Sequence, residues 1–187
     1  TERYTIEEMR ILRDDIFERF PDKLHDLTFL RHTVLSEAAT RAGYSEFLVD
    51  EAFAVFDEIR NDVDLFPEAR STLTALAERY TLIAVTNGNA NLEKIGIDDL
   101  FDHHLSAAKA GAAKPDRQIF DVAVSMGGAS AAETLHVGDD PRTDIHGARE
   151  AGLRTAWVNR NGHEWPDRFR EPDMTIGHVG ELLEILL

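Results

Sequence analysis

Three carboxylates lie close together in the segment LHVGDDPRTD, residues 135–144: Asp139, Asp140 and Asp144. They follow an apolar run of strand length. Like charges at this density repel one another and raise each other's pKa unless a cation or a group of donors compensates them. The helix dipole favours acids in a first helical turn, which accounts for one or two of the three. Three acids beside a glycine at a strand end therefore favour a bound metal ion.

Two other segments carry polar groups that suit an anion. Thr86, Asn87 and Gly88 follow an apolar run and offer a hydroxyl, an amide and a glycine that lets backbone N–H groups approach a ligand. Lys114 precedes Pro115 and a helical segment. Each has an ordinary interpretation when taken alone, because Asn-Gly is a common turn signal and a single lysine is usually solvated.

The elements that must position these groups alternate between strand and helix from residue 66 onward. Alternation at this spacing predicts an α/β fold, a Rossmann-like doubly wound parallel sheet whose chemistry lies at the carboxyl ends of the strands. Both the TNGN and the GDD segments fall at such ends. The predicted strands are 80–85, 134–137, 154–158 and 174–176, and the predicted helices are 67–77, 116–126, 142–151 and 179–187.

The first third of the chain has helical periodicity instead. Thr5 and Glu8 have the spacing of a capping box ahead of a helix that ends near Pro21. Two further helices are predicted over 27–42 and 47–59, and together the three form a small helical unit.

Composition excludes several classes of function. The 187 residues contain no cysteine and carry a formal charge of −15, which disfavours thiolate chemistry, nucleic acid and anionic membranes as partners. No apolar run is long enough to span a membrane and no signal peptide is recognisable, so we expect a cytoplasmic protein. Only four lysines accompany the excess of acid, and the hypothesis of a halophilic source follows from that surface.

In order and spacing, the segments VTNGNA, AAKP and LHVGDDPRTDIHGAREAG resemble the second, third and fourth motifs of the haloacid dehalogenase-like (HAD) superfamily of phosphohydrolases. The resemblance extends over residues 67–158. It implies a helical cap over residues 1–64 and a Rossmann-like core over residues 65–187. The segment TNGNA most resembles the corresponding motif of the branch that acts on flavin mononucleotide and phosphorylated ribityl-pyrimidine precursors.

The resemblance implies roles for the acids. Asp139 would be a Mg²⁺ ligand, a hard oxygen donor for a hard cation. Asp140 and Asp144 would support that ligand or orient Lys114, and the sequence does not separate these two roles.

The resemblance also implies a phosphate site. Lys114 would neutralise the phosphoryl group and the nucleophile, while Thr86, the backbone N–H of Asn87 and Gly88 would hold phosphate oxygens. Such a site acts by positioning and charge stabilisation. Arg31, in the cap, could reach the phosphate or base of a substrate, although a surface arginine is the simpler interpretation.

The family's nucleophile and its general acid/base are aspartates of a D-x-D motif that closes the first core strand, and this chain begins inside the cap. Asp62 and Asp64 form a D-x-D, but it follows a polar segment, so we interpret it as a charged linker. The first strand would lie between those ending at Thr86 and Val137, and its loss would cost about 1–3 kcal/mol for each unsatisfied backbone group. We therefore expect a segment upstream of Thr1.

The function expected from these residues is a Mg²⁺-dependent phosphatase that acts on a small phosphorylated metabolite through a phosphoaspartyl intermediate, as a monomer or homodimer. A dehalogenase of the same superfamily is the nearest alternative, with a serine-type motif expected in place of GDD. A non-catalytic binding or regulatory module is the alternative if the nucleophile strand is absent. His136 and Trp157, both within predicted strands, are expected to be core residues.

Overall fold

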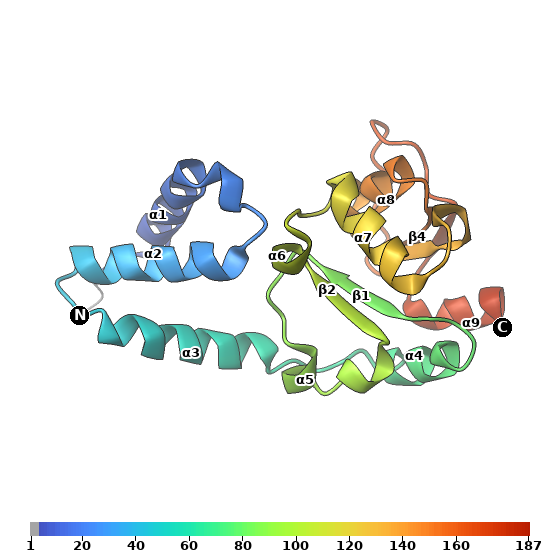
Figure 1. The fold of residues 1–187 in the computed structure, drawn as a ribbon, viewed down its shortest axis with the longest axis horizontal. Helices are drawn as coiled ribbons and strands as arrows, with labels where there is room; N and C mark the ends of the chain where they lie inside the picture. The colour runs from blue at the N-terminus through green and yellow to red at the C-terminus, as the bar shows by residue number, and fades with distance from the viewer. Residues whose placement is uncertain (1–3) are drawn as a thin grey trace.

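The computed structural model describes residues 4–187, in which three helices lie to one side of a sheet-containing core (Figure 1). The three are α1 (Ile6–Arg19), α2 (Leu27–Arg41) and α3 (Phe47–Asn61). Thr5 and Glu8 form the predicted capping box at the start of α1. The helices pack through an apolar stripe on α1 and α2 that consists of Leu12, Ile16, Leu30, Val34 and Ala38.

The strands are all parallel, as predicted, and form two sheets. One sheet pairs β1 (Ile83–Thr86) with β2 (His103–Ser106). The other has the order β3-β4-β5, with β3 at Leu135–Gly138, β4 at Arg154–Val158 and β5 at Met174–Ile176. β2 was not among the predicted strands.

The edges of the two sheets face each other across a largely apolar slot. The slot has a volume of about 410 Å³ and is lined by residues of both β1 and β3. Because these are the strands ending at Thr86 and beside Val137, the slot lies where the sequence analysis expects a further strand. Phe120 and Leu182 are among the other residues that line it.

Helices cover both sheets. The longest is α7 (Arg117–Gly127), which buries Ile119, Phe120 and Ala123 against Leu105 of β2. The others are α4 (Ala69–Ala77), α5 (Leu92–Ile95), α6 (Ala107–Ala110), α8 (Gly147–Glu150) and α9 (Leu182–Leu186). Within residues 4–187, no helix combines the length and the apolar character needed to cross a membrane.

The segment predicted as one helix over 142–151 has two parts. A π-helical turn over Pro141–His146 precedes α8. In this turn the N–H of Ile145 donates to the carbonyl of Asp140 at 3.2 Å, the i to i+5 bond that widens a helix. π-Bulges of this kind occur often at functional sites.

An exposed linker joins α3 to α4. Asp62, Val63 and Asp64 are all exposed in it, and Asp62 is the C-cap residue of α3. This position agrees with their interpretation as a charged linker. On the same ground we propose the boundary between cap and core at residues 64 and 65.

Replacing Gly147 by alanine tests the packing of α8. A Cβ at this position would lie 2.8 Å from the Cα of Pro115 and 2.9 Å from Cε2 of Phe120. We expect Gly147→Ala to lower the free energy of unfolding by about 1–3 kcal/mol through overpacking, measured by urea denaturation. Alanine is favoured over glycine inside a helix by about 0.5–1 kcal/mol, so an unchanged or raised stability would contradict this close approach.

Candidate active site

The three sequence segments singled out for chemistry meet at the carboxyl ends of β1 and β3. The Nζ of Lys114 lies 2.6 Å from Oδ1 of Asp144 and donates to the backbone carbonyl of Val85 at 3.2 Å. Val85 belongs to β1, whereas Asp144 follows β3. Lys114 therefore connects the two sheets at the edge where parallel α/β folds place their ligands.

The side chain of Asn87 holds the backbone of this lysine. Its Oδ1 accepts from the N–H of Lys114 at 2.7 Å, and its Nδ2 donates to the carbonyl of Lys114 at 2.8 Å. The amide thus satisfies one donor and one acceptor of the same residue. From the sequence, only the backbone N–H of Asn87 is expected to bind a ligand. Its amide side chain can both donate and accept, and that property is the signal for its contact with the Lys114 backbone.

Gly88 closes a tight turn after β1. Its N–H donates to Oγ1 of Thr86 at 2.8 Å. A Cβ on Gly88 would lie 3.2 Å from that hydroxyl and 2.7 Å from Nη2 of Arg60. A larger residue would therefore disturb both the hydroxyl and a guanidinium that approaches from α3.

The three acids make different contacts. Asp140 is the N-cap of the π-helical turn, and its carboxylate accepts from the N–H groups of Arg142 at 3.0 Å and Thr143 at 2.6 Å. Asp139 is exposed, and its carboxylate makes no hydrogen bond or ion pair with any residue of 4–187, while its carbonyl accepts from Nε1 of Trp157 at 2.9 Å. Asp139 thus combines a fixed backbone with a free carboxylate.

Asp144 is buried, with 5% of its surface exposed. Besides Lys114 it contacts Nε2 of His136 at 3.3 Å, and its Oδ2 accepts from the N–H of Asp140 at 3.0 Å. Burial raises the pKa of the Asp144 carboxyl, but the hydrogen bond to His136, the charge of Lys114 and the Asp140 N–H together hold that pKa well below its usual range. Asp144 is therefore ionised at neutral pH, where it pairs with the ammonium group of Lys114.

Steric contact explains why the GDD segment begins with a glycine. A Cβ on Gly138 would lie 2.5 Å from Oδ2 of Asp144. Only glycine lets this carboxylate pack directly over the end of β3.

Two residues expected in the core are there. His136 packs edge-to-face on Phe120, with ring centroids 5.2 Å apart. Trp157 is 4% exposed and packs against Trp165. Both act on the site indirectly, His136 through Asp144 and Trp157 through the backbone of Asp139.

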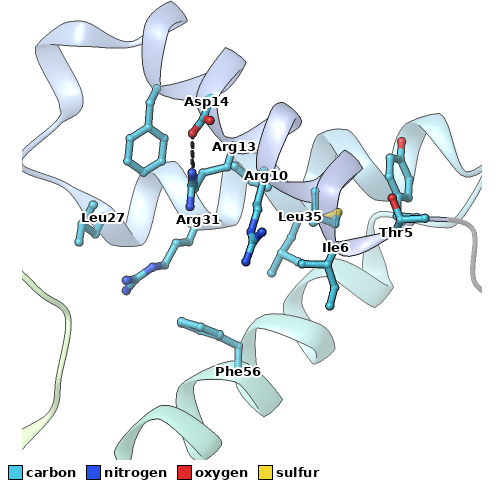
Figure 2. Close-up of a pocket in the computed structure, with 13 residues that line it drawn as sticks. Thr5, Ile6, Arg10, Arg13, Asp14, Leu27, Arg31, Leu35 and Phe56 are labelled. Carbon is cyan, nitrogen blue, oxygen red and sulfur yellow. Dashed lines mark hydrogen bonds and ion pairs between the residues drawn. The ribbon is translucent and has the colours of Figure 1, made fainter.

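Arg31 is more than a surface residue. Its guanidinium donates to Oδ1 of Asn89 in the loop after β1 and lies 5.2 Å from the ring centroid of Phe56. Figure 2 shows Arg31 extending from α2 above Phe56 of α3, at one end of a largely apolar pocket of about 840 Å³ between the cap helices. Arg31 and Asn89 are 58 residues apart in the chain, so no local sequence signal indicates their contact.

The donor set is suited to a hard cation held in part by water and substrate. Among residues 4–187, no group of three or more His, Asp or Glu side chains converges on one point. Mg²⁺ does not require such a group, since it is commonly bound through one or two carboxylates together with water and phosphate oxygens. The free carboxylate of Asp139 fits this requirement.

Comparisons with known proteins identify the family of this chain. The haloacid dehalogenase-like hydrolase family matches residues 6–152. The chain is 31% identical to the 5-amino-6-(5-phospho-D-ribitylamino)uracil phosphatase YigB of Escherichia coli, over 96% of this chain and 79% of that protein. It is 32% identical to a phosphoserine phosphatase of Thermus thermophilus, over 81% of this chain and 63% of that protein. The crystal structure of a 2-haloacid dehalogenase from Pseudomonas syringae superposes with a TM-score of 0.92 at 37% identity, covering 98% of this chain and 81% of that one.

Removing the Asp144 carboxylate tests the buried pair. We expect Asp144→Asn to lower the free energy of unfolding by about 3–5 kcal/mol, because it leaves the charge of Lys114 buried without a partner. Since folding lowers the pKa of Asp144, its contribution is present above the unfolded pKa of about 3.9 and is lost as the pH falls through the folded value. The difference between wild type and Asp144→Asn should accordingly shrink in urea denaturation below about pH 4.

Asp139→Asn is the matched control for this experiment, because that neighbouring carboxylate has no partner among the described residues. It should leave stability in metal-free buffer nearly unchanged. Equal losses for the two variants would contradict the distinct roles of Asp139 and Asp144.

Proposed function

Because the chain belongs to the haloacid dehalogenase-like hydrolase family, we propose that this hydrolase is a Mg²⁺-dependent phosphatase of small phosphorylated metabolites. The observation that carries the proposal is the Lys114–Asp144 ion pair, which holds a lysine ammonium against β1, the strand that Thr86 ends, and against the turn that follows β3 and Asp139. A cation, a hydroxyl and a free acid at one edge of a parallel sheet suit the charge stabilisation that phosphoryl transfer needs.

Lys114 would bind a phosphoryl oxygen and offset the negative charge that gathers there. Its backbone is held by Asn87 and its ammonium by Asp144 and Val85, so little reorganisation is needed when substrate arrives. The Thr86 hydroxyl would donate to a second oxygen while it continues to accept from the N–H of Gly88.

Asp139 would be the protein ligand of Mg²⁺. When bound, the ion would supply further positive charge at the phosphoryl oxygens. Asp140 serves this ligand indirectly, because its capping of the π-helical turn fixes the backbone that follows Asp139.

The nucleophile would be an aspartate carboxylate upstream of Thr1, carried by a strand in the slot between β1 and β3. The slot supports this proposal because it is apolar and its two walls are sheet edges that end beside Thr86 and Asp139. The carboxylate oxygen would attack phosphorus as the ester P–O bond breaks, and the alcohol would leave with a proton from a general acid. Water would then hydrolyse the phosphoaspartate and release phosphate.

The resemblance to YigB extends over nearly the whole chain, so phosphorylated ribityl-pyrimidines and flavin mononucleotide are the first substrates to test. A dehalogenase is the second candidate, and the structural similarity to a 2-haloacid dehalogenase favours it. The GDD segment, with its free Asp139, favours phosphatase instead. A non-catalytic module is the remaining alternative.

Chelation separates these candidates. The protein as it occurs, with any segment that precedes Thr1, should release phosphate from a panel of phosphorylated metabolites, lose this activity in EDTA and regain it with Mg²⁺. Chelator-resistant phosphate release would contradict the role of Asp139. Halide release from 2-chloropropionate without phosphate release would identify a dehalogenase, and the absence of both activities would identify a non-catalytic module.

Substitution of Lys114 tests the phosphoryl contact. We expect Lys114→Met to lower kcat about 10²–10³-fold, the usual effect of removing a group that stabilises developing charge. The control is Asp62→Asn in the exposed linker, which should retain activity. A comparable loss in Asp62→Asn would place the nucleophile in that linker and overturn its assignment upstream of Thr1.

A further inference from the structure

Two arginines approach the loop after β1 from the cap. Arg31 of α2 donates to Oδ1 of Asn89, and Arg60, in the last turn of α3, places its Nη2 2.7 Å from the position of a Cβ on Gly88. Their guanidinium groups are near enough for the charge of Arg60 to contribute to lowering the pKa of Arg31, after the larger effect of burial. The loop thus receives two positive charges from one side.

Neither arginine has an acidic partner in the part of the chain that the structure describes. Within residues 4–187, no carboxylate lies within ion-pair distance of Arg31 or Arg60, and Nε of Arg60 is buried without a hydrogen-bond partner. The chain has 35 acidic and 20 basic residues, so carboxylates are abundant elsewhere. A half-buried pair of like charges without a counter-ion is unfavourable, and a bound anion would offset it.

These guanidinium groups are suited to a carboxylate or phosphate. Arginine stays protonated and presents a planar set of donors that bonds two oxygens of such a group at once. Phe56, beneath Arg31 in Figure 2, limits the directions in which that guanidinium can point.

The side of approach distinguishes this site from the phosphoryl site. Lys114 and Asp144 lie on the core side of the loop, next to Val85 and Thr86. Arg31 and Arg60 meet the loop at Asn89 and Gly88, from the cap. An anion held by both arginines would therefore lie on the cap side of the loop.

We propose that Arg31 and Arg60 bind a second anionic group of the substrate, so that phosphate monoesters with an additional carboxylate or phosphate are preferred over substrates with a single phosphate, such as flavin mononucleotide. This inference rests on the proposed phosphatase function and names its substrate class.

Docking of the cap does not require this pair. The N–H of Asn91 donates to Oδ1 of the buried Asn61 at 2.8 Å, and Nζ of Lys94 lies 2.5 Å from Oδ2 of Asp57. Both contacts join α3 to the segment around α5, and both are fully partnered.

The test compares three probes on the active enzyme: p-nitrophenyl phosphate, which has no second anion, 3-phosphoglycerate, which adds a carboxylate, and fructose 1,6-bisphosphate, which adds a phosphate. Wild type should favour one of the last two. We expect Arg60→Met and Arg31→Met to raise KM for that probe about tenfold, equivalent to about 1.4 kcal/mol of binding, with kcat and the p-nitrophenyl phosphate kinetics nearly unchanged. Arg60→Lys should recover part of the loss, because it keeps the charge without the planar fork.

The control is Arg41→Met, which removes the same charge from the far end of α2, where Arg41 pairs with Glu37. It should behave as wild type. Equal losses on all three probes in the Arg31 and Arg60 variants, or a wild type without preference, would overturn the second-anion site while leaving the phosphatase proposal intact.

Calorimetric titration tests the anion site in the case in which the protein releases no phosphate. If wild type binds 3-phosphoglycerate or the bisphosphate more tightly than p-nitrophenyl phosphate and Arg60→Met abolishes the difference, the anion site stands even if no phosphate is released. The phosphatase proposal would then fail by itself.

Discussion

The structure around the site depends on one buried ion pair, between Lys114 and Asp144. Taking two charges out of water is costly, and the cost is offset only when each charge has further partners. Asp144 has His136 and the N–H of Asp140, while Lys114 has the carbonyl of Val85. This requirement explains the glycine at position 138, since the carboxylate must pack against the end of β3.

The same requirement explains the shape of the chain after β3. Asp140 caps the turn and Asp144 reaches back over the strand, so the backbone between them forms a π-helical turn before α8 begins. A regular helix from residue 141 would place these residues at the usual 100° spacing. The wider turn lets one acid face the backbone and the other face the lysine, while Asp139 stays outside both networks.

Local signals explain what could be predicted from the sequence. The capping box at Thr5 and the apolar periodicity that follows placed α1 correctly, because both are properties of neighbouring residues. β2 was missed because His103 and His104 make a short, polar strand whose pairing with β1 is not visible locally. The meeting of Thr86, Lys114 and Asp144 could be expected from the ends of parallel strands. Arg60 could not, because its neighbour Gly88 lies in another element.

The loop after β1 places an asparagine at every second position, and each connects to a different part of the molecule. Asn87 holds the backbone of Lys114, Asn89 accepts from Arg31, and Asn91 donates its N–H to Asn61 while its side chain caps α5. Hydrogen bonds from this one loop therefore reach both the cap helices and the backbone of Lys114. A shift of α2 or α3 relative to the core would stretch the bonds that Asn89 and Asn91 make, and these residues lie within four positions of the asparagine that holds the backbone of Lys114.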